Sequence, residues 1–322
     1  MGRESMPFAF SRPMQFIPHP MKMPWGGRQL AQYVSCSLPD GPVGEVWLIS
    51  DHPKHRSIVQ TGPAAGMTLH ELMTHHAIDM LGVECSRWPL LIKLLDARAN
   101  LSIQVHPDDE HAKRWAPNEG GKSEAWYVLE SSPQGCIYLD TKRGIDHNHL
   151  QKELAQGTLP LCLQQYHPQP GECYNVPAGT IHALGAGVVV LEVQQSSNAT
   201  FRLYDWGRVD EQGHPRPLHL QAALACLRFN PLGAGLGAPQ RLSAGCEGLV
   251  ATPYFSIQRW SAGSHQWSGP SFIFSLSGPP LTVHEVMITN YAITFLPAAA
   301  APIELNLTAS QQLLHIGLPN NK

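Results

Sequence analysis

Stretches in which apolar and polar residues alternate with a period of two run through this chain and predict β-strands. The clearest is Leu101–His106, where the apolar side chains face one side of a strand and Ser102, Gln104 and His106 face the other. The apolar run Pro89–Leu95, which only Lys93 interrupts, indicates a strand that is buried. Further strands are predicted at residues 44–50, 122–130, 172–176, 181–184, 188–195 and 200–204.

Two segments carry helix signals and predict helical insertions among the strands. Thr68 followed by Glu71 forms a capping-box pattern at the start of an insertion near 68–82. A second insertion, near 146–165, begins with a helix that Asp146 caps. Short helices are also predicted after Pro107 and at about 218–227.

The composition changes near Asn230, after which Pro, Gly, Ser and Ala dominate and charged residues are few. Strands are still predicted there, at 249–260, 272–276 and 313–316, but no cluster of candidate metal ligands follows Asn230. We therefore expect a larger domain at 1–235 that carries the chemistry, and a smaller all-β domain at 236–322.

Charge and hydropathy exclude two classes of partner. The formal net charge is −3 and only 15% of the residues are charged, so the chain has no basic excess with which to bind nucleic acid. Its longest apolar runs, such as 187–191, are too short to span a membrane, and residues 1–20 lack the pattern of a signal peptide. The seven cysteines are odd in number and form no CxxC pair, which predicts free thiols and a cytoplasmic location.

The polar faces of three predicted strands carry residue types that can serve as metal ligands. Gln104 and His106 share one face, Glu124 shares another with Lys122, and His182 opens a strand after a Pro-x-Gly turn. If these faces line one cavity, they offer two histidines, one carboxylate and one amide oxygen. Such a set suits Zn²⁺ as a Lewis acid, or a non-haem Fe²⁺ with open positions for a substrate.

The spacing of the turn before His182 resembles a known metal-binding motif. Gly171, five residues, Pro177-x-Gly179, two residues and His182 are similar to the second motif of the cupins, which are small β-barrels that bind a metal inside. Ala186 stands where that motif has its final Asn. The match therefore favours a cupin barrel.

Longer strings carry a more specific resemblance, which is strongest over residues 89–206. Four such strings, in the order in which they stand along the chain, resemble the metal-dependent, type I mannose-6-phosphate isomerases of the short bacterial kind. Leu48 and Ala125 are mild departures, at positions where many relatives carry an acid and a Cys. The strings are Leu101–Asp109, Gly121–Tyr127, Pro177–Leu184 and Glu192–Tyr204.

This resemblance implies a mainly β fold. It consists of a cupin (jelly-roll) catalytic domain with helical insertions and a smaller, degenerate cupin-like C-terminal domain. It also implies that Gln104, His106, Glu124 and His182 bind one Zn²⁺ per chain, or another divalent metal in its place. The substrate class is then a phosphorylated sugar, mannose 6-phosphate or fructose 6-phosphate. We expect a monomer or a weak homo-oligomer.

Two further residues match catalytic positions of the family, Arg202 and Lys122. Arg202 alternates with apolar neighbours, so we expect it to face the cavity, where it stabilises an enediolate or assists ring opening; an ordinary ion pair is the alternative. Lys122 binds the phosphate or carries a proton, unless it is a solvated surface lysine. The sequence does not identify the base that moves the proton between C1 and C2. The candidates are Glu192, His106 and a metal-bound water.

Two other functions compete with the isomerase. The same ligands suit a cupin dioxygenase that uses iron and O₂. A cupin that binds a sugar or a metal without converting it is the other alternative. Intact matches at all four ligand positions, at Lys122 and at Arg202 favour a working isomerase.

Overall fold

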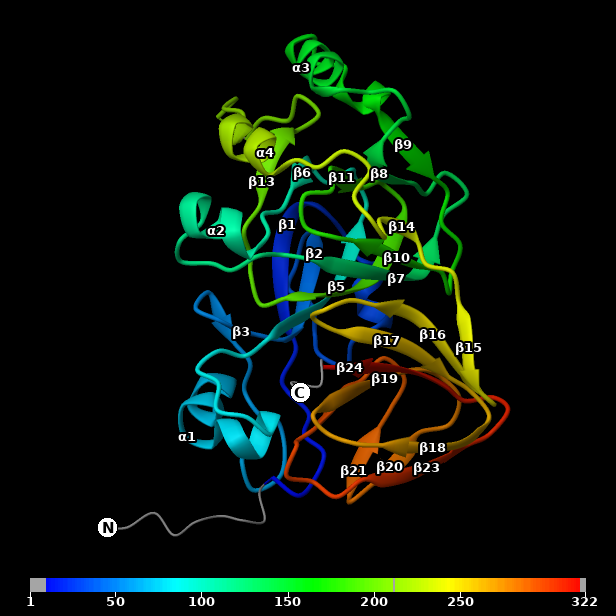
Figure 1. The fold of residues 1–322 in the computed structure, drawn as a ribbon. Helices are drawn as coiled ribbons and strands as arrows, with labels where there is room; N and C mark the ends of the chain where they lie inside the picture. The colour runs from blue at the N-terminus through cyan, green and yellow to red at the C-terminus, as the bar shows by residue number, and fades with distance from the viewer. Residues whose placement is uncertain (1–9, 211, 319–322) are drawn as a thin grey trace.

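The computed structural model describes residues 10–210 and 212–318, and most of its regular structure is β (Figure 1). It contains 24 strands, four α-helices and two short 3-10 helices within these two ranges. Strands dominate because the apolar runs are short and are separated by Gly- and Pro-rich turns. The prediction of a mainly β fold is confirmed.

A seven-stranded antiparallel sheet forms the middle layer of the molecule, in the order β1-β2-β5-β12-β7-β10-β14. Both of its faces are covered, and β5 is buried at every position. Burial on two sides explains why the run that contains β5 is mostly apolar, with Lys93 as an interruption, and does not alternate. The strands are β1 (His19–Gly27), β2 (Val43–Ile49), β5 (Leu90–Ala97), β12 (Val188–Gln195), β7 (Glu124–Ser131), β10 (Cys173–Val176) and β14 (Gly235–Leu236).

A five-stranded sheet, in the order β13-β6-β11-β8-β9, completes a barrel with one face of the middle sheet. Apolar side chains from both sheets, among them Leu95, Trp126 and Leu139, fill the space between them. The outer face of the small sheet packs against the helical insertions through residues such as Val105 and Leu203. Its strands are β13 (Phe201–Tyr204), β6 (Ile103–Val105), β11 (His182–Leu184), β8 (Ile137–Thr141) and β9 (Leu163–Tyr166).

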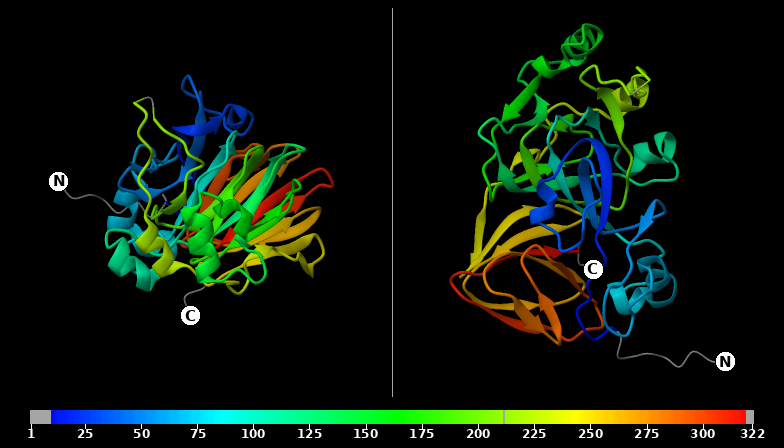
Figure 2. Two further views of the ribbon diagram at one scale, coloured as in Figure 1. Left: turned by 90° about the horizontal axis from the view of Figure 1, so that it is seen from above. Right: turned by 180° about the vertical axis from the view of Figure 1, so that it is seen from behind.

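The C-terminal strands build a third, six-stranded sheet, in the order β15-β16-β17-β24-β19-β22, which Figure 2 shows in yellow to red. Ile92 and Leu191 of the middle sheet share one hydrophobic core with Phe272 and Ile316 of this sheet. The middle sheet therefore lies between the barrel interior and the C-terminal sheet. The strands are β15 (Gln240–Ser243), β16 (Cys246–Ala251), β17 (Ser256–Trp260), β24 (Gln312–Gly317), β19 (Ser271–Ser277) and β22 (Ile293–Leu296).

Three small antiparallel pairs complete the strands, and the start of the chain joins the C-terminal sheet. The amide of Met14 donates to the carbonyl of Phe295 at 2.7 Å, and the reverse bond measures 2.8 Å. The start of the described chain is thus tied to β22 of the C-terminal sheet. The pairs are β3 (Asp51–His52) with β4 (His55–Arg56), β18 (Gly263–Trp267) with β23 (Ile303–Leu307), and β20 (Leu281–Val283) with β21 (Val286–Ile288).

The helices begin where the sequence predicts. Thr68 and Glu71 form the predicted capping box, and the Asp146 side chain accepts from the amide of His149. The first helix ends at Gly82, whose φ of 75° is readily adopted only by glycine. The helices are α1 (Leu69–Leu81), α2 (Asp109–Trp115), α3 (His147–Ala155), α4 (Leu220–Cys226), η1 (Gln29–Gln32) and η2 (Leu159–Cys162).

None of the helices in the described ranges is long and apolar enough to cross a membrane. All seven cysteines carry free thiols, as their odd number and spacing predict.

Candidate active site

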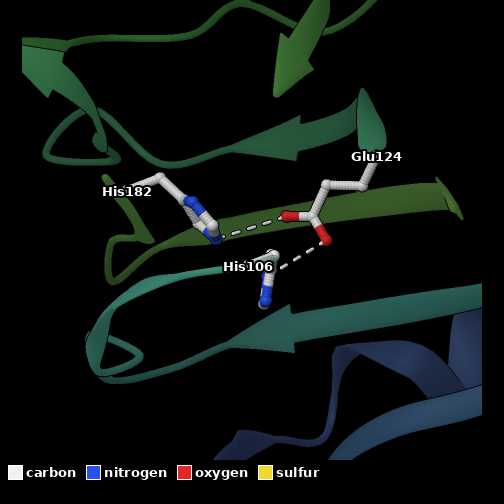
Figure 3. Close-up of side chains that lie close together, drawn as sticks. All are labelled: His106, Glu124 and His182. Carbon is white, nitrogen blue, oxygen red and sulfur yellow. Dashed lines mark ion pairs between the residues drawn. The ribbon is translucent and has the colours of Figure 1, made fainter. Parts of the chain in front are cut away.

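Three predicted ligands meet inside the barrel (Figure 3). His106 directly follows β6, Glu124 is the first residue of β7, and His182 is the first residue of β11. One potential ligand atom from each of them lies within 4.8 Å of the others, and all three side chains are buried. The structure thus brings together residues that lie up to 76 positions apart in the sequence, from 106 to 182.

The fourth predicted ligand, Gln104, lies beside them in the middle of β6. It pairs across the sheet with His182 on one side and with Arg202 on the other. Directly opposite residues of antiparallel strands point to the same face, so these three side chains form a row. Their apolar sequence neighbours pack on the outer face, which places the row on the inner face. The predicted strand parity is confirmed.

Backbone hydrogen bonds fix the segments that carry the ligands. The amide of Gly179, in the Pro-x-Gly turn, donates to the carbonyl of His106 at 2.9 Å. The amide of Lys122 donates to the carbonyl of Pro107 at 2.8 Å. A Cβ atom added to Gly121 would lie 2.6 Å from the backbone nitrogen of Asp109, so only glycine allows this close approach. The ligand positions are therefore set by the backbone and not by the side chains alone.

Each histidine is oriented by a hydrogen bond from its Nδ1 to a backbone carbonyl. The His106 bond to Ala199 measures 2.7 Å and the His182 bond to Thr180 measures 2.9 Å. A ring that donates from Nδ1 keeps a lone pair on Nε2, which is the form that binds a metal. The Nε2 atoms of His106 and His182 lie 3.5 Å and 3.4 Å from the two oxygens of Glu124.

Burial keeps both imidazoles neutral. It lowers the pKa of His182 to about 4, and with the nearby charge of Lys122 it holds the pKa of His106 well below its ordinary value. The Nε2 of His182 is buried and has no hydrogen-bond partner. An unpartnered nitrogen lone pair that faces a carboxylate fits a bound divalent cation.

A lysine adjoins the ligands. The Nζ of Lys122 lies 2.7 Å from Glu124 and 3.1 Å from the Nε2 of His106, and the residue is only 4% exposed. Lys122 is therefore not a solvated surface lysine. Burial and the negative charge of Glu192 raise the pKa of Glu124 to about 7, against the opposing effect of Lys122.

A chain of buried charges continues from Lys122 away from the ligands. Glu192 lies 3.6 Å from Lys122 and 3.2 Å from Lys93, and Lys93 lies 3.5 Å from Glu45. Burial disfavours the charged form of Lys93, but Glu192 and Glu45 outweigh it and raise the pKa of this lysine. Such buried charges persist because each has an opposite partner.

The sequence patterns predicted no role for Lys93 or Glu45. A signal was present, because each interrupts a strand whose neighbours are apolar, and a charge inside a doubly buried strand needs a partner. The partners come from other strands, so the sequence alone did not reveal them.

Arg202 lies at the edge of the inner row and is half-buried. Its guanidinium donates to the carbonyl of Pro217 at 2.8 Å, while its Nε is buried without a partner. Among the described residues, no carboxylate lies within ion-pair distance of Arg202, so the ordinary ion pair that we considered as an alternative is not formed there.

Comparison with known proteins identifies the family. A model of the type I phosphomannose isomerase catalytic domain matches residues 15–131. The mannose-6-phosphate isomerase ManA of Bacillus subtilis is 34% identical over 264 residues, which cover 78% of this chain and 80% of that protein. The chain belongs to the type I phosphomannose isomerase family.

Further relatives agree with this membership. The mannose-6-phosphate isomerase of Streptococcus mutans is 37% identical over 240 residues, covering 73% of this chain and 74% of the relative. The crystal structure of the Bacillus subtilis mannose 6-phosphate isomerase superposes with a TM-score of 0.85 at 31% identity, covering 95% of this chain and all of that one. The predicted phosphomannose isomerase resemblance and its cupin fold are confirmed.

Proposed function

We propose that this protein interconverts mannose 6-phosphate and fructose 6-phosphate as a metal-dependent aldose–ketose isomerase. The observation that carries the proposal is the buried cluster of His106, Glu124 and His182 with Lys122 in contact. Relatives at 34% and 37% identity are named for this activity. The names of these relatives favour the isomerase over the iron dioxygenase and over a cupin that only binds.

We propose that Gln104, His106, Glu124 and His182 hold one Zn²⁺ per chain. Two neutral imidazoles, a carboxylate and an amide oxygen are donors that zinc accepts, and other divalent metals can take the same set. When bound, the ion supplies a Lewis acid that polarises the oxygens of the sugar.

Proton transfer needs a base beside the reacting carbons. Isomerisation removes a proton from C2 of the opened aldose and returns one to C1, through a cis-enediol. Glu192 is a candidate base, because the Trp126 indole donates to it at 3.1 Å and Lys93 and Lys122 flank it. Burial disfavours its charged form, but the two lysines outweigh burial and lower the pKa of Glu192. A carboxylate that is ionised at neutral pH can accept the proton.

We assign Lys122 a role at the reacting end of the sugar. Its ammonium lies within 3.6 Å of Glu124, His106 and Glu192, where negative charge develops on the sugar oxygens. A buried positive charge there stabilises the enediolate in an environment of low dielectric. Arg202 supplies a second positive charge from the edge of the inner row.

Other parts of the proposal concern the setting of the enzyme. The free thiols support a reducing, cytoplasmic location, and the net charge of −3 supports the absence of nucleic-acid partners. We also propose a monomer or weak homo-oligomer, no membrane partner, and a division into a catalytic domain at 1–235 and a smaller domain at 236–322.

A coupled assay tests the function. Fructose 6-phosphate formed from mannose 6-phosphate is measured for the protein loaded with Zn²⁺ and after removal of metal by a chelator. We expect turnover that the chelator abolishes and added Zn²⁺ restores. No turnover by the loaded protein would exclude the isomerase, and turnover that survives proven metal removal would exclude only the metal. Oxygen consumption by an iron-loaded sample would instead favour the dioxygenase.

A further inference from the structure

The short segment that carries Lys122 is anchored through its backbone on both sides of the lysine. The amide of Gly121 donates to the carboxylate of Asp109 at 2.9 Å, and the amide of Ser123 donates to the side-chain oxygen of Gln195 at 2.8 Å. The amide of Lys122, between them, donates to a backbone carbonyl. All three residues of the segment are buried, so an amide that loses its partner there is costly to leave unpaired.

Asp109 is available for this contact because it does not cap its own helix. The cap of α2 is the preceding Asp108, whose carboxylate accepts from the amide of His111. Asp109 is the first residue of the helix, and its two oxygens bind other parts of the chain. One accepts from the amide of Gly121, and the other accepts from the hydroxyl of Tyr254 at 3.3 Å. Asp109 therefore joins three separate segments of the protein.

Gln195 holds the other end of the segment. It is the last residue of β12, and its backbone amide donates to the carbonyl of Ser123 at 3.1 Å, while its side-chain oxygen accepts from the amide of the same residue. Its side-chain nitrogen donates to Asp109 at 3.4 Å, so the two anchors also contact each other. The hydroxyl of Ser123 accepts from the amide of Ala178, in the Pro-x-Gly turn. The segment is thus joined both to β12 and to that turn.

Tyr254 extends the anchor to the C-terminal sheet. It lies in the turn between β16 and β17, where the hydroxyl of Thr252 accepts from the amides of Tyr254 and Phe255 at 3.1 Å and 3.0 Å. Burial and the charge of Asp109 raise the pKa of Tyr254, so its hydroxyl keeps the proton that it donates. A side chain of the C-terminal sheet therefore holds the carboxylate that binds the segment of Lys122.

Lys122 depends on these anchors more than the predicted metal ligand that follows it. Glu124 is the first residue of β7 and is paired with Val176 and Gln194 on the strands at its two sides. Lys122 lies two residues before that strand begins, where side chains supply the partners of its neighbouring amides. Loss of an anchor should therefore displace the lysine, while strand pairing keeps Glu124 in place.

The place of the Lys122 ammonium matters for the role that we assign to it. Its Nζ lies 2.7 Å from Glu124, 3.1 Å from the Nε2 of His106 and 3.6 Å from Glu192. The stem of a lysine is flexible, so these contacts do not hold the backbone in place by themselves. A misplacement of about 1 Å at a reacting group can lower a rate by on the order of 10²-fold.

We infer that Asp109 and Gln195 are positioning residues for Lys122, and that Tyr254 makes the C-terminal sheet part of this support. The inference rests on the proposed function, since it takes the role of Lys122 from there. The C-terminal sheet then acts on the reaction through hydrogen bonds to the segment that carries the lysine.

The test compares three variants of one helical turn at equal zinc content and well below their melting temperatures. We expect Asp109→Ala to lower kcat by about 10-fold, the factor for one lost hydrogen bond to a charged group, with KM changed less. Asp109→Asn keeps an acceptor oxygen for Gly121 and should restore most of kcat. Glu110→Ala removes the next, exposed acid of the helix and should match the wild type. A wild-type kcat for Asp109→Ala, or an equal fall in Asp109→Asn, would overturn the inference.

A double variant separates positioning from a general loss of structure. In the background of Lys122→Met, Asp109→Ala should lower kcat no further, because its effect passes through the lysine. A second fall of full size would overturn the inference. Gln195→Met, which loses the acceptor, and Tyr254→Phe, which loses only the hydroxyl, should each lower kcat by less than Asp109→Ala. A wild-type kcat in either variant would overturn the role of that residue.

Hydrogen exchange reads the anchors without turnover. The amides of residues 121–123 should exchange faster in Asp109→Ala than in the wild type and in Glu110→Ala, because the segment opens more often. Equal exchange in all three proteins would overturn the inference. If exchange rises as expected but the wild type shows no isomerase turnover, the proposed function fails, and with it the catalytic part of the inference, whereas the hydrogen-bond support stands.

Discussion

Lys122 lies 2.7 Å from Glu124, the same carboxylate that faces the Nε2 atoms of both histidines. One carboxylate thus connects a candidate metal site with a candidate catalytic cation. Because both residues are almost fully buried, neither can exchange its partner for water without cost. This pair makes the metal site and the acid–base chemistry depend on each other.

Replacing Lys122 tests that dependence. We expect Lys122→Met to lower kcat by about 10²- to 10⁴-fold, because the charge that stabilises the enediolate is lost. Lys113→Met on the exposed face of α2 is the matched control and should keep wild-type turnover. The measurement is steady-state kinetics on samples with equal zinc content. A kcat within a few-fold of wild type would remove Lys122 from the chemistry.

Replacing His182 tests metal binding. Loss of the hydrogen-bond partner that supports a metal ligand weakens metal binding by about 10- to 100-fold. His182→Ala removes a predicted ligand itself, so we expect it to weaken Zn²⁺ binding by more than that. His149→Ala, on the exposed side of α3, serves as the control and should retain one zinc per chain. Metal content after dialysis and competition with a chromophoric chelator give the result. Equal zinc retention by both variants would show that His182 is not a ligand.

The pH dependence of stability tests a histidine in the C-terminal sheet. His315 is largely buried against Trp260, with ring centroids 4.4 Å apart, and burial lowers its pKa to about 4. His315 binds a proton near pH 6.5 in the unfolded chain and only near pH 4 in the folded chain. Its contribution to the free energy of unfolding is therefore fully present above pH 6.5 and is lost as the pH falls from 6.5 to 4.

At pH 4 the protonation of His315 should lower the free energy of unfolding by up to about 3 kcal/mol. His315→Phe should remove this part of the dependence of the unfolding free energy on pH. Urea unfolding at several pH values between 7 and 4 measures it. His149→Phe, which replaces an exposed histidine, should leave the slope as in the wild type. Parallel pH profiles for the wild type and His315→Phe would contradict the prediction.

The shared core predicts one unfolding transition for the whole chain. Phe272 is fully buried in the C-terminal sheet, with its ring centroid 5.9 Å from that of Trp88. Phe272→Ala should destabilise the protein by about 3–5 kcal/mol, as large-to-small core changes do. Because Ile92 of the barrel belongs to the same core, enzyme activity and circular dichroism should be lost together on heating. Two separate transitions would show that the C-terminal sheet folds on its own.

Local features of this protein can be predicted from its amino-acid sequence. The alternation in Leu101–His106 predicted which face Gln104 and His106 share, because side chains of a strand point to opposite sides in turn. The Thr68 capping box predicted the start of α1 for an equally local reason. The motif around His182 indicated a cupin, and the longer strings over residues 89–206 indicated the family and, with it, a predicted set of ligands.

Contacts between residues that are distant in the sequence depend on how the strands pair. Lys93 and Glu45 lie on neighbouring strands of one sheet, and Glu192 lies on the strand at the other side of β5. These three residues meet because of the order of the strands in the sheet, which no local sequence pattern predicts. Likewise, Arg202 meets the carbonyl of Pro217 because the loop after β13 folds back onto this strand. Local patterns fix which way a side chain points, but the pairing of strands decides what it faces.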